Sequence, residues 1–324
     1  MSEQKTPKLA IVGAGSVGAT IAYACMIRGV AKRLAIYDTN EKKVNAEVLD
    51  LNHGLQFVPM ASLDGSADIA VCADADIVVI TAGAKQKPGQ NRMDLAQANV
   101  RISRELVPKL VAVAPKATIL LVTNPVDVIT YVTLKLSGFP RQRVFGSGTV
   151  LDSSRFRFLI ASRLKVAVQN VHATIAGEHG DSEIPLWSSA SVANIPLHEW
   201  AVPQHGKLSV RDRTEIFQNV KNAAYQIVEG KGATNYAIGL STAKILEALL
   251  HDESRILPVS SLLTDYRPLG NEGDAISNVC LSVPCIVNRA GVEQALSIPM
   301  NEAEAAGLRH SAETIKEAIR AVGF

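Results

Sequence analysis

The sequence predicts an α/β fold, with a doubly wound parallel sheet followed by a mixed α+β region. Short β-branched runs such as Asp76–Thr81 (DIVVIT) and Thr118–Thr123 (TILLVT) are typical of strands buried on both faces. Helical patterns separate these runs, and strands that alternate with helices indicate parallel pairing. After Gly146–Gly148 the pattern changes to longer helices and shorter strand-like pieces.

The first half begins with one βαβ unit. Lys8–Val12 is predicted as a buried strand, Ser16–Arg28 as a helix and Arg33–Tyr37 as a second strand. Helices are also expected over Glu41–Leu51 and Leu95–Val113, between the later strands.

The second half is expected to form a separate domain. A chain of 324 residues exceeds the size at which one hydrophobic core usually stops growing, so we expect a cofactor domain at 1–148 and a substrate domain at 149–324. The segment 234–250 is expected to fold back against the first domain. Ser311 is the expected N-cap of the last helix. The predicted helices of this half are Ser153–Leu164, Val210–Glu229, Thr234–Leu250 and Ala312–Val322.

Composition argues against several functions. The 33 basic and 31 acidic residues are scattered without a long basic run, so nucleic acid is not expected as a partner. No segment approaches the roughly 18 uninterrupted apolar residues of a membrane helix. The four cysteines show no CxxC or Cys/His ligand spacing, which predicts no metal site and a reduced, cytoplasmic protein.

A glycine-rich motif indicates a dinucleotide site. Gly13–Gly18 (GAGSVG) matches GxGxxG between a predicted strand and a predicted helix, the arrangement of a Rossmann-type unit. Asp38 ends the second strand, where a carboxylate would bind ribose hydroxyls and repel a 2′-phosphate, so NAD is favoured over NADP. Alternatively, the glycines serve only packing and Asp38 is a solvated turn residue. The expected cofactor-binding residues are Gly13, Gly15, Val17, Gly18, Asp38, Lys43, Gly83, Ala84, Val122, Asn124 and Ser147.

One histidine lies in a setting that suits catalysis. His179 stands between glycines in Ala176–Ser182 (AGEHGDS), so a substrate could approach its ring closely. By itself, such a histidine is more often a turn residue. Asp152 and Arg155, three residues apart on a predicted helix, could face the same cleft. Their presence favours a catalytic role for His179 over a turn role.

Six segments, taken in order, make the chain resemble the lactate/malate dehydrogenase family over essentially its full length. Such a series is far more specific than any single motif. The segments are GAGSVG at Gly13, TAGAKQKPGQNR at Thr81, TNPVD at Thr123, GSGTVLDSSRFR at Gly146, AGEHGDS at Ala176 and KGAT at Lys231.

The resemblance implies reversible hydride transfer between NADH and a small 2-keto acid. His179 would then be the proton donor, oriented by Asp152, because reduction of a ketone places negative charge on its oxygen. Arg155 would grip the substrate carboxylate through two parallel hydrogen bonds. Arg92, carried by a mobile lid at 85–95, would polarise the carbonyl after closure. The implied substrate-binding residues are Gln86, Arg92, Asn124, Arg155 and Thr234.

Gln86 is the residue on which substrate choice depends. The matching family position carries arginine when the substrate is a dicarboxylate, so a neutral glutamine favours pyruvate and L-lactate over oxaloacetate and malate. Lys85 and Lys87 flank it and leave malate dehydrogenase activity as an alternative. An NAD-dependent glycosidase would need Cys/His metal ligands, which are not apparent. A non-catalytic NAD-binding protein would leave His179 and its partners unexplained.

A second site is implied by the same resemblance. Arg157 and His172 match positions at which bacterial family members that respond to fructose 1,6-bisphosphate bind this effector at a subunit interface. Repeated by two-fold symmetry, these residues would form a cationic cluster. Alternatively, Arg157 is a solvated helix residue and His172 a strand-end residue. A homotetramer is expected from the resemblance alone.

Overall fold

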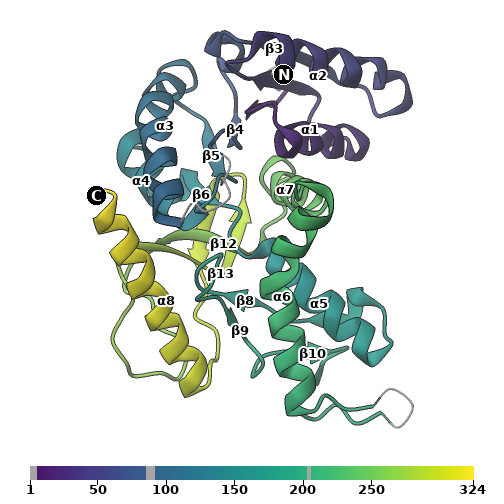
Figure 1. Ribbon diagram of the computed structural model, residues 1–324, viewed down its shortest axis with the longest axis vertical. Coiled ribbons are helices and arrows are strands. Elements are labelled where there is room, and N and C mark those ends of the chain that lie inside the picture. Colours follow the sequence, from purple (N-terminus) through teal and green to yellow (C-terminus); the bar gives the residue numbers. More distant parts are fainter. Residues whose placement is uncertain (1–5, 85–91, 203–205) are drawn as a thin grey trace, which may run out of the picture.

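A computed structural model of the protein describes residues 6–84, 92–202 and 206–324, and within them a nine-stranded sheet forms the centre of the molecule (Figure 1). Six neighbouring strands run parallel in the order β3-β2-β1-β4-β5-β6, the order of a dinucleotide-binding Rossmann sheet. The predicted doubly wound fold is therefore confirmed. These strands are β1 (Lys8–Val12), β2 (Arg33–Tyr37), β3 (Ser62–Ser66), β4 (Ile77–Ile80), β5 (Thr118–Leu121) and β6 (Val144–Gly146).

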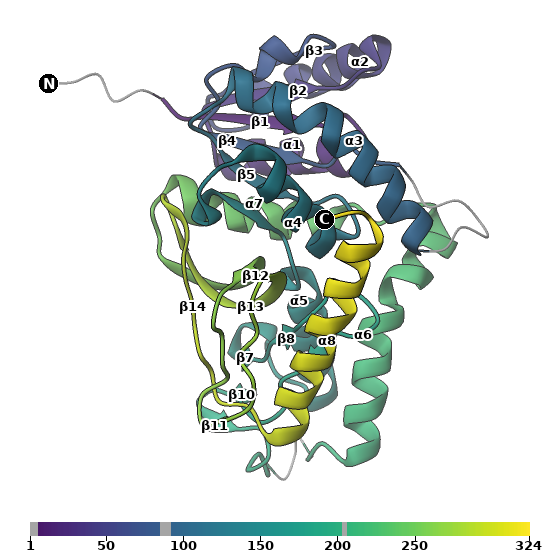
Figure 2. The same ribbon diagram turned by 90° about the vertical axis from the view of Figure 1, so that its left-hand side faces the viewer.

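Helices cover both faces of this sheet. In Figure 2, α3 and α4 lie in front of the strands, whereas α1 and α7 lie behind them and contact each other. Burial on both faces explains why β4 and β5 are apolar at nearly every position instead of alternating. The helices of the first half are α1 (Ser16–Arg28), α2 (Glu41–His53), α3 (Arg92–Val113) and α4 (Val126–Ser137).

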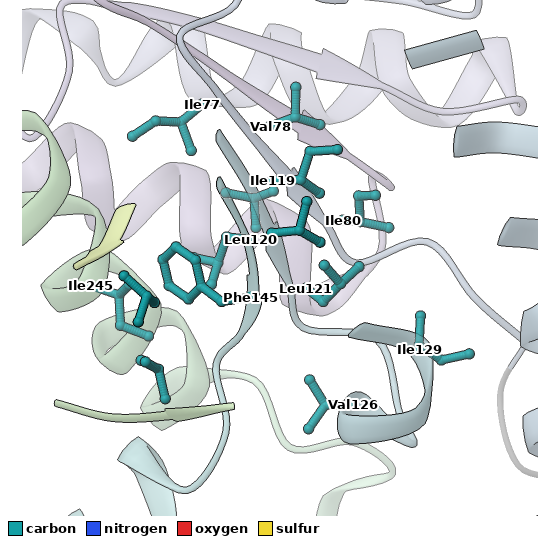
Figure 3. Close-up of a cluster of buried hydrophobic side chains, with 14 of the residues drawn as sticks. Ile77, Val78, Ile80, Ile119, Leu120, Leu121, Val126, Ile129, Phe145 and Ile245 are labelled. Carbon is teal, nitrogen blue, oxygen red and sulfur yellow. The ribbon is translucent and has the colours of Figure 1, made fainter. Parts of the chain in front are cut away.

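The main hydrophobic core fills the space between the sheet and its helices. Figure 3 shows Ile77 and Val78 of β4 close to Ile119 and Leu120 of β5, with Phe145 of β6 beside them. All five side chains are nearly or completely buried. This packing fixes the carboxyl ends of β1, β4 and β5 at one edge, where ligands bind in sheets of this kind.

The sheet continues into the second half of the chain. The strands β12 (Arg255–Leu263), β13 (Val279–Asn288) and β14 (Gly291–Ala295) add to it in antiparallel order, and Ser260 of β12 pairs with Gly146 of β6. The expectation of only short strand-like pieces here is wrong for β12 and β13. Their internal prolines, Pro258 and Pro284, argue against strands in a sequence, but they lie opposite each other in the register of this pair.

A smaller unit packs below the sheet. Its core joins Phe156 and Ile160 of α5 (Val150–Leu164) with Ile216 and Val220 of α6 (Val210–Lys231). The helix α7 (Tyr236–Leu250) lies against α1, far from it in sequence. Two small sheets complete the unit, built from β7 (Val171–His172), β8 (Ile175–Ala176), β9 (Ile184–Pro185), β10 (Ser191–Val192) and β11 (Ile195–Pro196).

The last helix begins earlier than predicted. α8 (Glu302–Ala321) starts at a capping box in which Asn301 accepts from the N–H of Glu304, while the Glu304 side chain bonds back to Asn301. The prediction that Ser311 is the N-cap is wrong, because Ser311 is buried in mid-helix and accepts a hydrogen bond from the N–H of Glu178. None of the described helices combines the length and apolar character needed to cross a bilayer.

Candidate active site

A cavity of roughly 1220 Å³ lies between the carboxyl edge of the parallel strands and helix α6. It brings together most of the residues that the sequence predicts for cofactor and substrate. Gly18 and Ser147 do not line it: Gly18 packs against Gly13, and buried Ser147 donates its N–H to Leu121. The predicted residues that line the cavity are Gly13, Gly15, Val17, Asp38, Lys43, Gly83, Ala84, Val122, Asn124, Asp152, Arg155, His179 and Thr234.

The glycine-rich loop is shaped for a phosphate group. Gly13 has φ +113°, and a Cβ there would lie 2.7 Å from Oγ1 of Thr81. A Cβ on Gly18 would lie 1.9 Å from the carbonyl oxygen of Gly13, so only glycine permits this contact between α1 and the loop. Around Gly15, the N-cap of α1, the space is open. A ligand phosphate can therefore approach the N–H groups and the positive dipole at the start of α1.

Asp38 is held at the end of β2 in an orientation that suits ribose. Its Oδ2 accepts the N–H of Ala14 at 2.7 Å, and its Oδ1 accepts the N–H of Asn40 at 2.9 Å. The first bond ties Asp38 to the glycine-rich loop. The cavity thus has a glycine-rich loop at the start of a helix and a carboxylate at the end of the second strand, two features of a dinucleotide site.

Asn99 of α3, a residue not predicted from the sequence, joins the two strand-end loops that border the cavity. Its Oδ1 accepts the N–H of Ala84, and its Nδ2 donates to the carbonyl oxygen of Asn124, both at 2.7 Å. Asn99 is almost fully buried. A polar residue on the buried face of a helix was the available signal, and the pattern did not reveal what it would contact.

His179, Asp152 and Arg155 converge on the cavity. Nδ1 of His179 lies 2.5 Å from Oδ2 of Asp152, and a guanidinium nitrogen of Arg155 donates to Oδ1 of the same carboxylate at 2.7 Å. Asp152 and Arg155 come from the first turns of α5, one helical turn apart. The side chain of Asp152 is 3% exposed, so its charge acts in a medium of low polarity.

The electrostatic setting keeps a proton on His179. Burial by itself would lower the pKa of His179, but the charge and hydrogen bond of Asp152, together with the carboxyls of Asp127 and Glu183, raise it to about 9. Burial would raise the pKa of Asp152, yet the contacts with His179 and Arg155 lower it overall. At neutral pH the pair is therefore an imidazolium beside a carboxylate, which can release a proton to a bound substrate.

Two further carboxyl groups were not predicted. Asp127, on α4, accepts the backbone N–H of His179 at 2.8 Å. Glu183 lines the cavity and is buried, and its Oε1 has no hydrogen-bond partner among the described residues. Burial and the charge of Asp152 raise the pKa of Glu183 to about 8. Across the described part of the chain, no cluster of His, Cys, Asp and Glu is arranged to hold a metal ion.

Two predicted residues of the lid are not placed. Gln86 lies outside the described residues, and so does the side chain of Arg92. The backbone of Arg92 begins α3, and Leu95, one turn later, lines the cavity. The predicted lid therefore leads directly into α3, a helix that borders the cavity.

Arg157 and His172 lie away from this cavity. Arg157 is partly buried, and its Nε donates to the carbonyl oxygen of Ala173 at 2.8 Å. Ala173 directly follows His172, and His172 is exposed on β7. The two predicted effector residues thus come from neighbouring segments of the smaller unit.

Comparison with known proteins identifies the family. The lactate/malate dehydrogenase NAD binding domain matches residues 7–146, and the lactate/malate dehydrogenase alpha/beta C-terminal domain matches residues 149–323. The chain belongs to the lactate/malate dehydrogenase family. The predicted family and NAD cofactor are confirmed, and the phosphate cradle and Asp38 fit this dinucleotide.

Members of the family named L-lactate dehydrogenase are similar over nearly their whole length. The protein from Bifidobacterium animalis subsp. lactis is 54% identical over 321 residues, covering 99% of this chain and 98% of that protein. One from Clostridium botulinum is 46% identical, covering 98% of each.

Solved structures of family members are equally close in fold. A lactate dehydrogenase from a deep-sea metagenome library has a TM-score of 0.91 at 36% identity, covering 98% of this chain and 99% of that one. The minor L-lactate dehydrogenase of Enterococcus mundtii, in a ligand-bound form, has a TM-score of 0.90 at 39% identity, covering 97% and 98%.

Proposed function

We propose that the protein is an NAD-dependent L-lactate dehydrogenase that reduces pyruvate to L-lactate and catalyses the reverse reaction. The observation that carries this proposal is the convergence of His179, Asp152 and Arg155 on the cavity that contains the dinucleotide cradle. Those three side chains provide a proton donor, its counter-charge and a carboxylate anchor within one site. The names of the similar L-lactate dehydrogenases support the choice of substrate.

The protein's own residues divide the reaction between them. Bound NADH supplies the hydride that adds to the carbonyl carbon of pyruvate. His179 gives its proton to the carbonyl oxygen from Nε2, because Nδ1 is held by Asp152. The carboxylate of Asp152 stabilises the imidazolium before the transfer and fixes the orientation of the ring. In the direction of lactate oxidation, neutral His179 accepts the hydroxyl proton instead.

Arg155 and Arg92 handle the charges of the substrate. Arg155 binds the substrate carboxylate, for which a planar guanidinium offers two parallel donors. Arg92 polarises the carbonyl oxygen when the lid closes and excludes water. Asn124 and Thr234 line the part of the cavity that holds the substrate.

NAD is held by the cradle and by the ends of the strands. The glycine-rich loop at 13–18 receives the pyrophosphate, and Asp38 binds the adenosine ribose. Gly83, Ala84, Val122, Val17 and Lys43 also line the cavity that would hold NAD. Ser147, whose N–H is bonded to Leu121, would support the backbone after β6.

One assay tests the proposed reaction and its alternative. Oxidation of NADH is followed with pyruvate and then with oxaloacetate, each across a range of concentrations. A larger kcat/KM for pyruvate supports the proposal, since Gln86 gives a second carboxylate no partner. A preference for oxaloacetate would instead indicate malate dehydrogenase activity and overturn it.

We also propose activation by fructose 1,6-bisphosphate at a site formed by Arg157 and His172 in a homotetramer. The nearness of Arg157 to Ala173, next to His172, supports a shared phosphate-binding surface. The ligand would activate only if the competent assembly binds it more tightly. Titration of the sugar bisphosphate at subsaturating pyruvate near pH 7 tests the site. A flat response in wild type, or equal activation of Arg157→Gln, contradicts it.

The division into a cofactor domain at 1–148 and a substrate domain at 149–324 is supported by the limits of the two matching domains at 7–146 and 149–323. Unfolding of the separate segments, followed by circular dichroism, tests it.

A cytoplasmic location is proposed from the reduced cysteines, all four of which are buried and free. Cell fractionation tests that location.

A further inference from the structure

Asp127 is a buried carboxylate with two donors from distant parts of the chain. It is the second residue of α4 and is 1% exposed. Its Oδ2 accepts the backbone N–H of His179 at 2.8 Å, and its Oδ1 accepts the hydroxyl of Ser260 at 2.6 Å. The side chain therefore meets the loop that carries His179 on one side and strand β12 on the other.

These bonds link three structural parts of the proposed active site. Asp127 follows Asn124 by three residues, so it moves with the loop that leaves β5 and lines the cavity. Ser260 belongs to β12 and pairs with Gly146 of the parallel sheet. The carboxylate thus fixes the backbone of His179 relative to Asn124, with the sheet as the support.

Hydrogen bonding does not explain why this group is charged. A neutral asparagine of the same shape could accept the N–H of His179 and donate to Ser260 at a lower cost of burial. A buried anion with two neutral donors therefore has a further role to fulfil. The charge of Asp127 raises the pKa of the His179 imidazole, so the protonated ring gains from this second negative charge.

We propose that Asp127 is a positioning residue for His179, which fixes the backbone of the proton donor and whose negative charge stabilises the imidazolium. This inference rests on the proposed function. Asp152 orients the ring through its side chain, whereas Asp127 acts through the backbone and the electric field. Two carboxylates from different elements, Asp152 on α5 and Asp127 on α4, therefore act on His179.

The titration of these groups agrees with such a role. Burial raises the pKa of Asp127 to about 6, although Ser260, the N–H of His179 and the charge of His179 each lower it, and Glu178 raises it. Cys280 of β13 also faces Asp127 and stays neutral because burial raises its thiol pKa. Above pH 6 the anion supports the imidazolium. Below pH 6 it gains a proton and this support is lost.

The test compares two variants with wild type. Asp127→Asn removes the charge and keeps the shape, and Ser260→Ala removes one donor but keeps the charge and the bond to His179. Pyruvate reduction is measured at saturating NADH between about pH 5 and pH 10, a range that covers both titrations. The pKa of His179 is measured separately by NMR of ring-labelled histidine, with His179→Gln for assignment.

The expected shifts differ between the variants. In Asp127→Asn the pKa of His179 falls by roughly half a unit to one unit, and the basic limb of kcat/KM moves with it. The inflection near pH 6 that the titration of Asp127 produces in the His179 ring resonances disappears. In Ser260→Ala the basic limb stays in place, and the inflection that Asp127 produces in the His179 ring resonances moves to higher pH because Asp127 loses a hydrogen bond that lowers its pKa. NADH binding and the melting temperature of Ser260→Ala control for folding.

Unchanged His179 titration in Asp127→Asn would overturn the inference, as would a loss of activity equal at every pH. If Asp127→Asn does not fold, wild-type His179 ring resonances that show no inflection near pH 6, where Asp127 titrates, overturn it. Failure of the proposed function gives a different result, since wild type would then not reduce pyruvate. The NMR comparison would still decide whether Asp127 supports the protonated ring.

Discussion

The carboxylate of Asp152 is shared between His179 and Arg155, with Oδ2 lying 2.5 Å from Nδ1 of the imidazole and Oδ1 2.7 Å from a guanidinium nitrogen. One buried anion therefore sets the position of both the proposed proton donor and the proposed substrate anchor. Because two cations meet it, the carboxylate stays ionised despite its burial. A substitution at Asp152 should accordingly change both the rate of the chemical step and the binding of substrate.

Asp152→Asn tests this shared role. The amide keeps the shape but loses the charge, so kcat for pyruvate reduction should fall by about a hundredfold or more, and KM should rise. The pH above which kcat/KM declines should also move down from about 9 in wild type, because the main group that raises the pKa of His179 is gone. Steady-state kinetics across pH provide the measurement. Unchanged NADH binding is the control, and a wild-type pH profile would contradict the assignment.

Arg155→Lys keeps the charge and removes the planar fork. The KM for pyruvate should rise by roughly ten- to a hundredfold, since one ammonium cannot make two parallel bonds to a carboxylate. Arg163→Lys is the matched control on the same helix, because the Arg163 side chain is 58% exposed in its pair with Asp212 and its exchange should affect KM little. Equal KM values for the two variants would remove Arg155 from the substrate site.

The elements that could be predicted are those whose local pattern agrees with their burial. β4 and β5 are uniformly apolar because both faces are covered, and α1 carries its glycine-rich start and Gly29 at its end. β12 could not be predicted in the same way, because Pro258 argues against a strand wherever the partner is unknown. The position of α8 was missed because Ser311 and Asn301 both suit a cap, and only the contact of Ser311 with Glu178 separates them.

The active-site residues show the same contrast between those that a local sequence pattern reveals and those that depend on distant partners. Motifs named His179, Asp152 and Arg155, since each stands in a short segment with a recognisable composition. Asp127 was missed because its role depends on partners 52 and 133 residues away, His179 and Ser260. Such contacts are a product of the folded sheet and leave no periodic signal in the chain.

Gln86→Arg tests the basis of substrate choice. A guanidinium at this position would pair with the second carboxylate of oxaloacetate, so the ratio of kcat/KM for oxaloacetate to that for pyruvate should rise by at least about tenfold. Lys87→Arg is a matched control, because it exchanges one cation for another in the same segment. A similar ratio in both variants would show that residue 86 does not contact the distal end of the substrate.

Glu183 predicts a dependence of stability on pH. Its pKa is raised to about 8 in the folded protein from its ordinary value of 4.5, mainly by burial and by the charge of Asp152. Between these values the folded state holds a proton that the unfolded chain has released, so the free energy of unfolding falls as pH rises. Each unit of difference corresponds to about 1.4 kcal/mol at full effect.

Glu183→Gln removes this contribution, since the amide carries no proton to lose. The variant should gain stability relative to wild type as the pH is raised from about 5 to about 8.5, with the gain complete above the folded pKa. Urea unfolding at both pH values measures the difference. A stability difference that is constant with pH would show that Glu183 is ionised in the folded protein throughout this range.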